Sequence, residues 1–100
     1  MKLIVTAEAE NDLRMLGRWI ARDNPRRAVT FVRDLRRLCL SLTDFPEKYP
    51  LLARHSASAI RRMVHGSYLI FYRIDGTSVV IIHVLHGASD YDAILFPNED

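Results

Sequence analysis

The sequence has little cysteine, proline or glycine and no long hydrophobic run. Its one cysteine, Cys39, cannot form a disulfide within the chain. The longest apolar stretch, Val79 to Leu85 even with His83 included, is far shorter than the roughly 18 residues that a membrane-spanning helix needs. No basic segment followed by an apolar one begins the chain, as it would in a secretory signal peptide. These absences predict a cytoplasmic protein that does not cross a membrane.

Lysine is also scarce, so arginine carries most of the positive charge. The chain has 14 basic residues and a net charge of +2, and only Lys2 and Lys48 are lysines. Arginine forms bidentate hydrogen bonds with carboxylates and phosphates that lysine does not form. Residues 14–37 hold eight arginines, whereas residues 76–100 hold four acids and no basic residue. This uneven charge predicts an anionic partner, either an acidic peptide or a nucleic acid, and a preferred docking face.

The remaining composition is ordinary, with 49% hydrophobic and 26% charged residues in a chain of 100 residues. Such a composition is typical of a soluble folded domain and not of a disordered segment. A chain of this length has room for one hydrophobic core. We therefore expect a single domain over residues 1–100, in which residues 88–100 form a C-terminal tail.

The first half of the chain predicts one strand and two helices. The predicted elements are a strand at residues 2–5 and helices at residues 7–22 and 25–44, in which apolar residues recur at helical spacing. Thr6 can cap the first helix with its hydroxyl group. Asn24 is a strong helix N-cap, and Pro25 is tolerated at the first helical position. The two helices are therefore expected to form an antiparallel hairpin.

The second half predicts a β-sheet. Residues 46–58 read as an irregular, flexible crossing, and β-rich runs follow at residues 59–64, 67–74 and 78–85. Asp75-Gly76 between the last two runs is typical of a tight type I′ turn, so the runs predict an antiparallel meander. The expected fold class is α+β, with an N-terminal strand, an antiparallel helical hairpin and a three-stranded antiparallel meander. The tail fits a short helix, an extra strand or a frayed end.

Three local patterns occur within this order of elements. The first is Asp12-Leu13 with Trp19-Ile20-Ala21 and Asn24-Pro25-Arg26-Arg27-Ala28, and the second is Tyr68-Leu69-Ile70-Phe71-Tyr72-Arg73. The third, Val84-Leu85-His86-Gly87-Ala88-Ser89-Asp90, is similar to the Leu-His-Gly-Ala-Arg-Asp ending of ParE-like proteins, with Ser89 in place of the usual arginine. Over nearly the whole chain, from the first strand to Asp90, the sequence resembles the ParE branch of the ParE/RelE toxins.

This resemblance implies a RelE/ParE-like fold and the toxin half of a type II toxin-antitoxin pair. The expected partners are a ParD-like antitoxin, in a hetero-oligomer, and DNA gyrase as the target. Operator DNA would be contacted only indirectly, through the antitoxin. The resemblance implies no cofactor, and we expect a protein that acts by binding and not by catalysis.

A RelE-like endonuclease that cleaves messenger RNA on the ribosome is the alternative, and a nontoxic relic that binds only antitoxin or DNA is a third hypothesis. The nuclease would need cationic and aromatic side chains on the open sheet face. Leu69 stands where the resemblance places one arginine of that cluster. The positions where the resemblance places further basic and tyrosine residues are occupied here by Gly87, Ala88, Ser89 and Leu95. Candidates for a rearranged catalytic site are Arg61, Arg73, His86 and Tyr91.

Several residues favour a structural role. His83 and His86 are three apart on a strand, so their side chains should point to opposite faces and cannot share a metal or a proton. Cys39 lies in the apolar stripe of the second helix, where it is a small hydrophobe without a redox role. The spacing of histidines, cysteines and acids predicts no metal site, and no glycine-rich phosphate loop occurs.

Two groups of residues are candidates for partner contacts. The antitoxin-binding candidates are Arg14, Arg18, Trp19, Arg22, Arg61 and Arg73. The first helix contributes arginines at spacing i, i+4 and i+8 beside Trp19, with Glu10 available as a surface ion-pair partner of Arg14; a solvated face is the alternative. The target-binding candidates are His86, Tyr91, Ile94, Leu95 and Phe96. Ile94, Leu95 and Phe96 either form an exposed docking site or cover the edge of the sheet.

Overall fold

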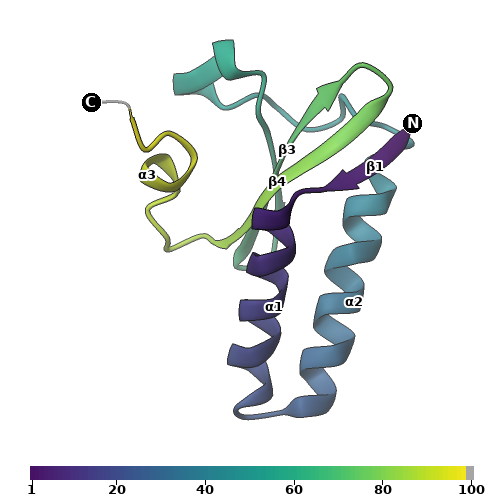
Figure 1. The fold of residues 1–100 in the computed structure, drawn as a ribbon, viewed down its shortest axis with the longest axis vertical. Coiled ribbons are helices and arrows are strands. Elements are labelled where there is room, and N and C mark those ends of the chain that lie inside the picture. The colour runs from purple at the N-terminus through teal and green to yellow at the C-terminus, as the bar shows by residue number, and fades with distance from the viewer. Residues whose placement is uncertain (99–100) are drawn as a thin grey trace.

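The computed structural model describes residues 1–98 and places a helical hairpin against a four-stranded sheet (Figure 1). Its elements are β1 (Lys2–Val5), α1 (Ala7–Ala21), α2 (Pro25–Ser41), the 3-10 helix η1 (Ala53–Ser58), β2 (Arg61–His65), β3 (Tyr68–Asp75), β4 (Ser78–His86) and α3 (Tyr91–Leu95). The α+β class and the order of elements are as predicted. The tail contains a short helix, and its last two residues lie outside the described part of the chain.

The sheet is mixed, with strand order β1-β4-β3-β2. The predicted antiparallel meander is confirmed for β2, β3 and β4. The N-terminal strand β1 pairs in parallel with β4, from Lys2 opposite Ser78 to Val5 opposite Ile81, so the sheet is not wholly antiparallel. Because β1 joins the edge of the sheet that β4 leaves free, the first and last strands of the chain lie side by side.

The hairpin turns differ from the sequence prediction by one residue. Asp75 pairs with Ser78, so the two-residue loop of the last hairpin is Gly76-Thr77 and not Asp75-Gly76. Gly76 has a φ of 58°, whereas Thr77 has no positive φ. A type I′ turn requires positive φ at both central residues, while a type II′ turn places glycine at the first. The prediction of a type I′ turn is therefore wrong, and the loop follows the type II′ pattern.

The helix starts match the capping signals of the sequence. Thr6 Oγ1 accepts a hydrogen bond from the Ala9 backbone N–H at 3.1 Å and donates its own proton to the Ile81 carbonyl at 2.8 Å. Asn24 Oδ1 accepts from the Arg27 backbone N–H at 3.1 Å, and Pro25 follows at the first helical position. Because Thr6 bonds to β4 as well as to its own helix, the start of α1 is fixed against the sheet.

The main core lies between the hairpin and one face of the sheet. The residues that form it are Ala9, Leu13, Leu35, Cys39, Leu42, Met63, Ile70, Tyr72, Val79, Ile81 and Val84. The position of Cys39 in this core agrees with its interpretation as a small hydrophobe. Burial raises the pKa of the Cys39 thiol to about 11, which keeps the thiol protonated at neutral pH.

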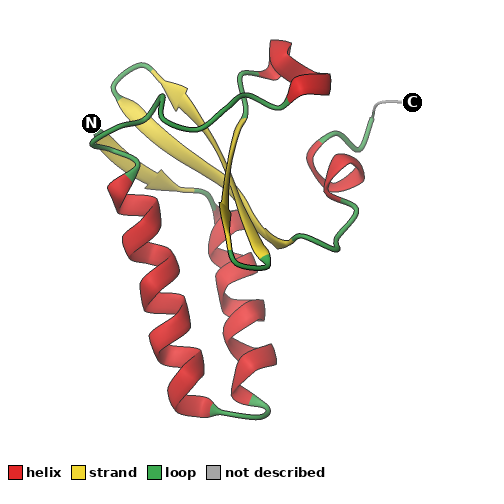
Figure 2. Ribbon diagram, turned by 180° about the vertical axis from the view of Figure 1, so that it is seen from behind, coloured by secondary structure: helices red, strands yellow, loops and turns green. Residues whose placement is uncertain are grey.

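A second core covers the opposite face of the sheet. Its buried residues are Leu52, Ile60, Leu69 and Phe71, and Tyr91, Leu95 and Phe96 pack against them. Leu52 and Ile60 flank η1, and Tyr91 and Leu95 belong to α3. Both elements lie away from the hairpin (Figure 2). The sequence interpretation treated this face as open, and the structure corrects that assumption at Leu69, which is 7% exposed.

Asp12 joins α1 to β4. Its Oδ2 atom accepts a hydrogen bond from the Val84 backbone N–H at 2.9 Å and lies 2.7 Å from His83 Nδ1. His86 has a separate neighbour, because its ring contacts the Tyr68 ring at a centroid distance of 5.3 Å. The two histidines thus have different partners. Both lie toward the hairpin, because Tyr68 also contacts Phe31 of α2, so the prediction that they point to opposite faces is wrong. A register shift between β3 and β4 interrupts the alternation that the prediction assumed.

Asp12→Ala is expected to lower the free energy of unfolding by about 1–3 kcal/mol, because a partly buried N–H and an imidazole lose their acceptor. Urea denaturation of the purified chain measures this loss. The matched control is Asp44→Ala, which removes an exposed carboxylate and should change stability by less than about 0.5 kcal/mol. Equal stability of the two variants would show that the contact of Asp12 with β4 contributes nothing.

Candidate functional site

A groove of about 780 Å³ runs along the two helices of the hairpin and is called the helical groove below. Its apolar lining residues are Leu13, Gly17, Ala21, Pro25, Ala28, Val29 and Val32, and its charged ones are Glu10, Arg14, Arg18, Arg33 and Arg36. At Gly17 an added Cβ would lie 3.3 Å from Val32 Cγ2, so glycine permits the close approach of the helices. Val29 is 70% exposed, which leaves an apolar side chain open to a partner.

One ion pair spans the groove. Arg36 donates two hydrogen bonds to the Glu10 carboxylate, at 2.8 and 2.7 Å. These bonds hold the pKa of Glu10 below its ordinary value. The expected partner of Glu10 was Arg14, which instead donates to Asn11 Oδ1 at 3.2 Å. The pairing therefore neutralises Arg36 and leaves Arg14, Arg18 and Arg33 as exposed cations beside the apolar lining.

The arginine stripe of α1 is divided between two flanks of the helix. Arg14 and Arg18 line the helical groove, whereas Trp19 and Arg22 do not. A helix advances about 100° per residue, so a residue at i+8 is rotated by about 80° from residue i. The Arg22 guanidinium lies 5.2 Å from the centre of the Trp19 ring, which is 64% exposed. The four residues predicted as one antitoxin surface therefore form two.

The other two antitoxin candidates lie away from the groove. Arg61 Nη1 donates hydrogen bonds to the backbone carbonyls of Glu47 at 3.3 Å and Tyr49 at 2.6 Å. This contact ties the chain before η1 to β2, which is a structural role for Arg61. Arg73 is exposed on β3. Neither residue lines the helical groove.

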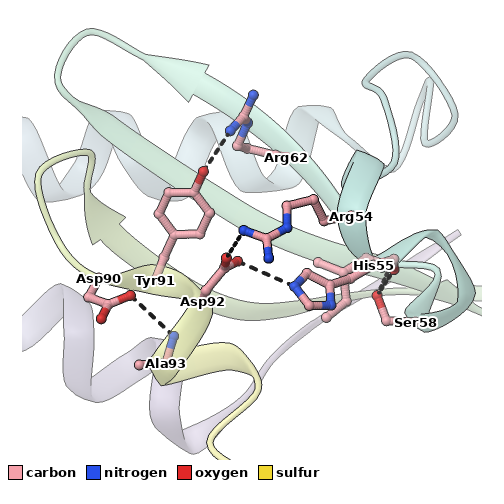
Figure 3. Close-up of polar contacts among 9 residues, drawn as sticks. Arg54, His55, Ser58, Arg62, Asp90, Tyr91, Asp92 and Ala93 are labelled. Carbon is pink, nitrogen blue, oxygen red and sulfur yellow. Dashed lines mark hydrogen bonds and ion pairs between the residues drawn. The ribbon is translucent and has the colours of Figure 1, made fainter. Parts of the chain in front are cut away.

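A second cluster lies between η1, β2 and α3 and is called the C-terminal pocket below (Figure 3). The pocket has a volume of about 410 Å³ and is lined by Pro50, Leu51, Leu52, Ala53, Arg54, His55, Arg62, Tyr91 and Asp92. Arg62 Nη1 donates to Tyr91 Oη at 3.2 Å. Asp92 Oδ2 lies 3.6 Å from Arg54 Nη1, and Asp92 Oδ1 lies 3.5 Å from His55 Nε2. The pocket thus holds two contact groups: the Asp92 carboxylate with Arg54 and His55, and the Tyr91 phenol with Arg62.

The rearranged catalytic site considered from the sequence is not assembled. Tyr91 meets Arg62 and not Arg61, because successive residues of a strand point to opposite faces. His86 contacts Tyr68, and its Nδ1 accepts from the Ala88 backbone N–H at 3.0 Å. Sequence reasoning missed Arg54, His55 and Asp92, which come from segments interpreted as loop and tail. The one sequence signal for part of this pocket was the alternation of side chains along a strand, which places Arg61 and Arg62 on opposite faces of the sheet.

The target-binding candidates have different surroundings. Tyr91, Leu95 and Phe96 are partly buried and pack against the second core. Ile94 is 42% exposed, and His86 is exposed as well. The expectation that three apolar tail residues stand exposed therefore holds only at Ile94. Leu95 and Phe96 instead fit the alternative, in which tail residues cover the sheet, although they cover a face of the sheet and not its edge.

Within residues 1–98, no three histidine, cysteine or acidic side chains come together in a way that could hold a metal ion. None of the helices in this part of the chain is long and apolar enough to span a bilayer. A helical hairpin on one face of a small sheet, a short helix on the other and an arginine-lined groove along the hairpin define a small α+β domain with the order of elements expected for a RelE/ParE-like fold.

The comparison with family models identifies the family. The model described as "ParE toxin of type II toxin-antitoxin system, parDE" matches residues 3–91. The chain therefore belongs to the ParE toxin family. This confirms the resemblance that the sequence patterns carried. A comparison with curated protein sequences gave no match.

Two solved structures share the fold. The chromosomal ParDE system from P. aeruginosa superimposes with a TM-score of 0.72 at 17% sequence identity, covering 86% of this chain and 95% of that chain. The RelBE2 toxin-antitoxin complex from Mycobacterium tuberculosis gives a TM-score of 0.65 at 27% identity, covering 85% of this chain and 95% of that chain. At 17% identity the first likeness concerns the fold alone.

Proposed function

We propose that this chain is the toxin of a type II toxin-antitoxin pair, that it inhibits DNA gyrase by binding and that a ParD-like antitoxin neutralises it. Membership of the ParE toxin family supports the toxin role. Both structural neighbours carry the names of toxin-antitoxin systems, which supports an antitoxin partner. Gyrase as the target follows from the ParE resemblance of the sequence.

The helical groove is the observation that carries the antitoxin partnership. Its lining is apolar, and Arg14, Arg18 and Arg33 stand exposed beside it. An amphipathic helix docks in such a groove through its apolar side chains, and carboxylates on its flanks would meet the arginines. The groove therefore suits an acidic, amphipathic segment, such as the disordered tail of a ribbon-helix-helix antitoxin.

The same antitoxin segment is expected to continue to an edge of the sheet. β1 and β2 are the edge strands, and they expose Ile4 by 46% and Val64 by 59%. An extended peptide can add to such an edge through backbone hydrogen bonds. A tail that binds both the groove and an edge would cover the arginine-rich side of the toxin.

The proposed toxin acts by binding its target and not by catalysing a reaction. Leu69 offers no charge to a phosphate, and its side chain is enclosed in the second core. A messenger-RNA endonuclease of the RelE type is the alternative function. The 27% identity with the RelBE2 structure and the meeting of Arg62 with Tyr91 favour that alternative.

Induction of the chain without antitoxin is expected to arrest division, cause filamentation and switch on the DNA-damage response, because gyrase inhibition interrupts a DNA-cleaving cycle. Co-expression of a neighbouring gene product with a ribbon-helix-helix domain and an acidic tail should restore growth. Primer extension on translated messages from the same cells should show no new codon-specific ends. New ends that disappear in Arg62→Ala and Tyr91→Ala would contradict the gyrase proposal and establish the nuclease.

A further inference from the structure

The tip of the helical hairpin carries three arginines that do not belong to the helical groove. Arg22 is the C-cap residue of α1, and Arg26 and Arg27 lie in the first turn of α2. They are called the tip arginines below, and all three are exposed. The tip projects away from the sheet (Figure 1). Because none of the tip arginines lines the helical groove, a helix docked in that groove would leave them uncovered.

The charge of the tip arginines is not neutralised by the described part of the chain. No carboxylate within residues 1–98 forms an ion pair with any of them. Arg26 and Arg27 also stand at the N-terminus of α2, and the first turn of that helix holds no acid. Cations are unfavourable at this end, because the helix dipole is positive there. The arrangement does not stabilise the helix, so an anion outside the chain is the partner that these charges lack.

Two aromatic rings hold tip arginines in place. The Arg22 guanidinium lies 5.2 Å from the centre of the Trp19 ring, and the Arg27 guanidinium lies 5.6 Å from the centre of the Phe31 ring. Both distances are those of cation–π contacts. Such a contact needs no acceptor atom, so the five N–H donors of each guanidinium group remain available for hydrogen bonds to phosphate oxygens.

We propose that the tip arginines bind the phosphate backbone of double-stranded DNA. The toxin then contacts DNA itself, whereas the ParE resemblance implied contact only through the antitoxin. Duplex DNA carries about one negative charge per 1.7 Å of its axis, and the guanidinium group matches the geometry of a phosphate. A single strand would need uncovered aromatic faces on which its bases could stack, but Arg22 and Arg27 lie over the two rings of the tip. An acidic amphipathic helix needs an apolar lining, which the helical groove provides.

Contacts to phosphates carry no sequence information, so the tip would add affinity for DNA without choosing a site. An antitoxin with a DNA-binding domain would choose the site and hold the tip close to the duplex at a high effective concentration. This consequence rests on the proposed antitoxin partnership. Binding of DNA by the tip does not, and the experiment below therefore uses the toxin alone.

Trp19 is an internal reporter for this contact, because it is the only tryptophan of the chain and lies beside Arg22. The full-length chain is titrated with a short DNA duplex of arbitrary sequence at several salt concentrations. We expect the fluorescence of Trp19 to change on binding. Three phosphate contacts give a slope of about −2.7 for the logarithm of the association constant against that of the salt concentration.

The triple variant Arg22→Gln, Arg26→Gln, Arg27→Gln should lose most of this slope and bind the duplex at least about tenfold more weakly at low salt. The matched control is Arg14→Gln, Arg18→Gln, Arg33→Gln, which removes the same charge from the helical groove of the same hairpin. Its slope should stay within about one of the wild-type value. Circular dichroism spectra like that of the wild type verify that both variants are folded.

Three results would overturn the proposal. The first is equal loss of binding in the two triple variants, which would indicate a diffuse attraction to the whole hairpin. The second is binding of the duplex, or its absence, without any change in the fluorescence of Trp19. The third is tighter binding of a single-stranded oligonucleotide or of a polyglutamate peptide than of the duplex, because either would identify another class of partner.

Discussion

Reversing two charges beside the helical groove is expected to abolish tight antitoxin binding. In the double variant Arg14→Glu, Arg18→Glu, the acidic partner helix would meet two carboxylates where it had met two guanidinium groups. Like charges brought together at an interface cost several kcal/mol, so the Kd should rise by roughly 10²–10³-fold. Isothermal titration calorimetry with the antitoxin from the neighbouring gene measures this change.

Arg22→Glu is the matched control for that experiment. Arg22 is the C-cap residue of the same helix but does not line the groove, and it contacts Trp19 instead. Its reversal should change the Kd by less than about fivefold, because a charge at the rim of an interface mainly affects the association rate. Equal losses in Arg22→Glu and in the double variant would place the antitoxin on the Trp19 flank and contradict the groove assignment.

Phe71→Ala is expected to lower the free energy of unfolding by about 3–5 kcal/mol, a large share of the roughly 5–15 kcal/mol that stabilises a typical domain. Phe71 is fully buried, with an exposed fraction of 0%, and it packs within the second core below Tyr91. Urea denaturation followed by circular dichroism measures the loss.

Val64→Ala is the control for Phe71, because Val64 lies on the neighbouring strand β2 and is 59% exposed. It should cost less than about 0.5 kcal/mol, as surface substitutions usually do. A loss below about 1 kcal/mol in Phe71→Ala would mean that α3 and the residues that flank η1 do not form a stable cover, since filled cores do not tolerate such truncation.

Local signals made most of the elements predictable from the sequence. Thr6, Asn24 and Pro25 identify the helix starts because capping depends on a few neighbouring residues. The glycines identify the hairpins, although the pairing of Asp75 with Ser78 shifts the loop by one residue. A glycine indicates that the turn contains a residue with positive φ. The register of the two strands decides which position of the loop that glycine occupies.

Contacts between distant segments were not predictable in the same way. The parallel pairing of β1 with β4 joins residues more than 70 positions apart and has no local signal. The partner of Glu10 is likewise on the other helix, at Arg36, whereas sequence spacing indicated Arg14. Both contacts depend on how separate elements pack against each other, and the periodicity within one element does not predict that packing.

The candidate sites illustrate the same limit. The arginines of the groove were predicted in part, because Arg14 and Arg18 share a face of one helix. Arg22 and Trp19 were grouped with them although helical rotation moves them to another flank. The C-terminal pocket draws its residues from three segments, so only the fold brings Arg62 and Asp92 to one place.

DNA gyrase inhibition by purified toxin is the central claim, and a plasmid assay tests it most directly. The toxin is added to gyrase and plasmid DNA at concentrations well above that of the enzyme, and the topoisomers and cleaved products are separated on agarose gels. We predict that supercoiling falls or that cleaved DNA accumulates, and that prior addition of the antitoxin prevents both effects. Unchanged supercoiling with no cleaved DNA, from a toxin preparation that still binds its antitoxin, would contradict gyrase as the target.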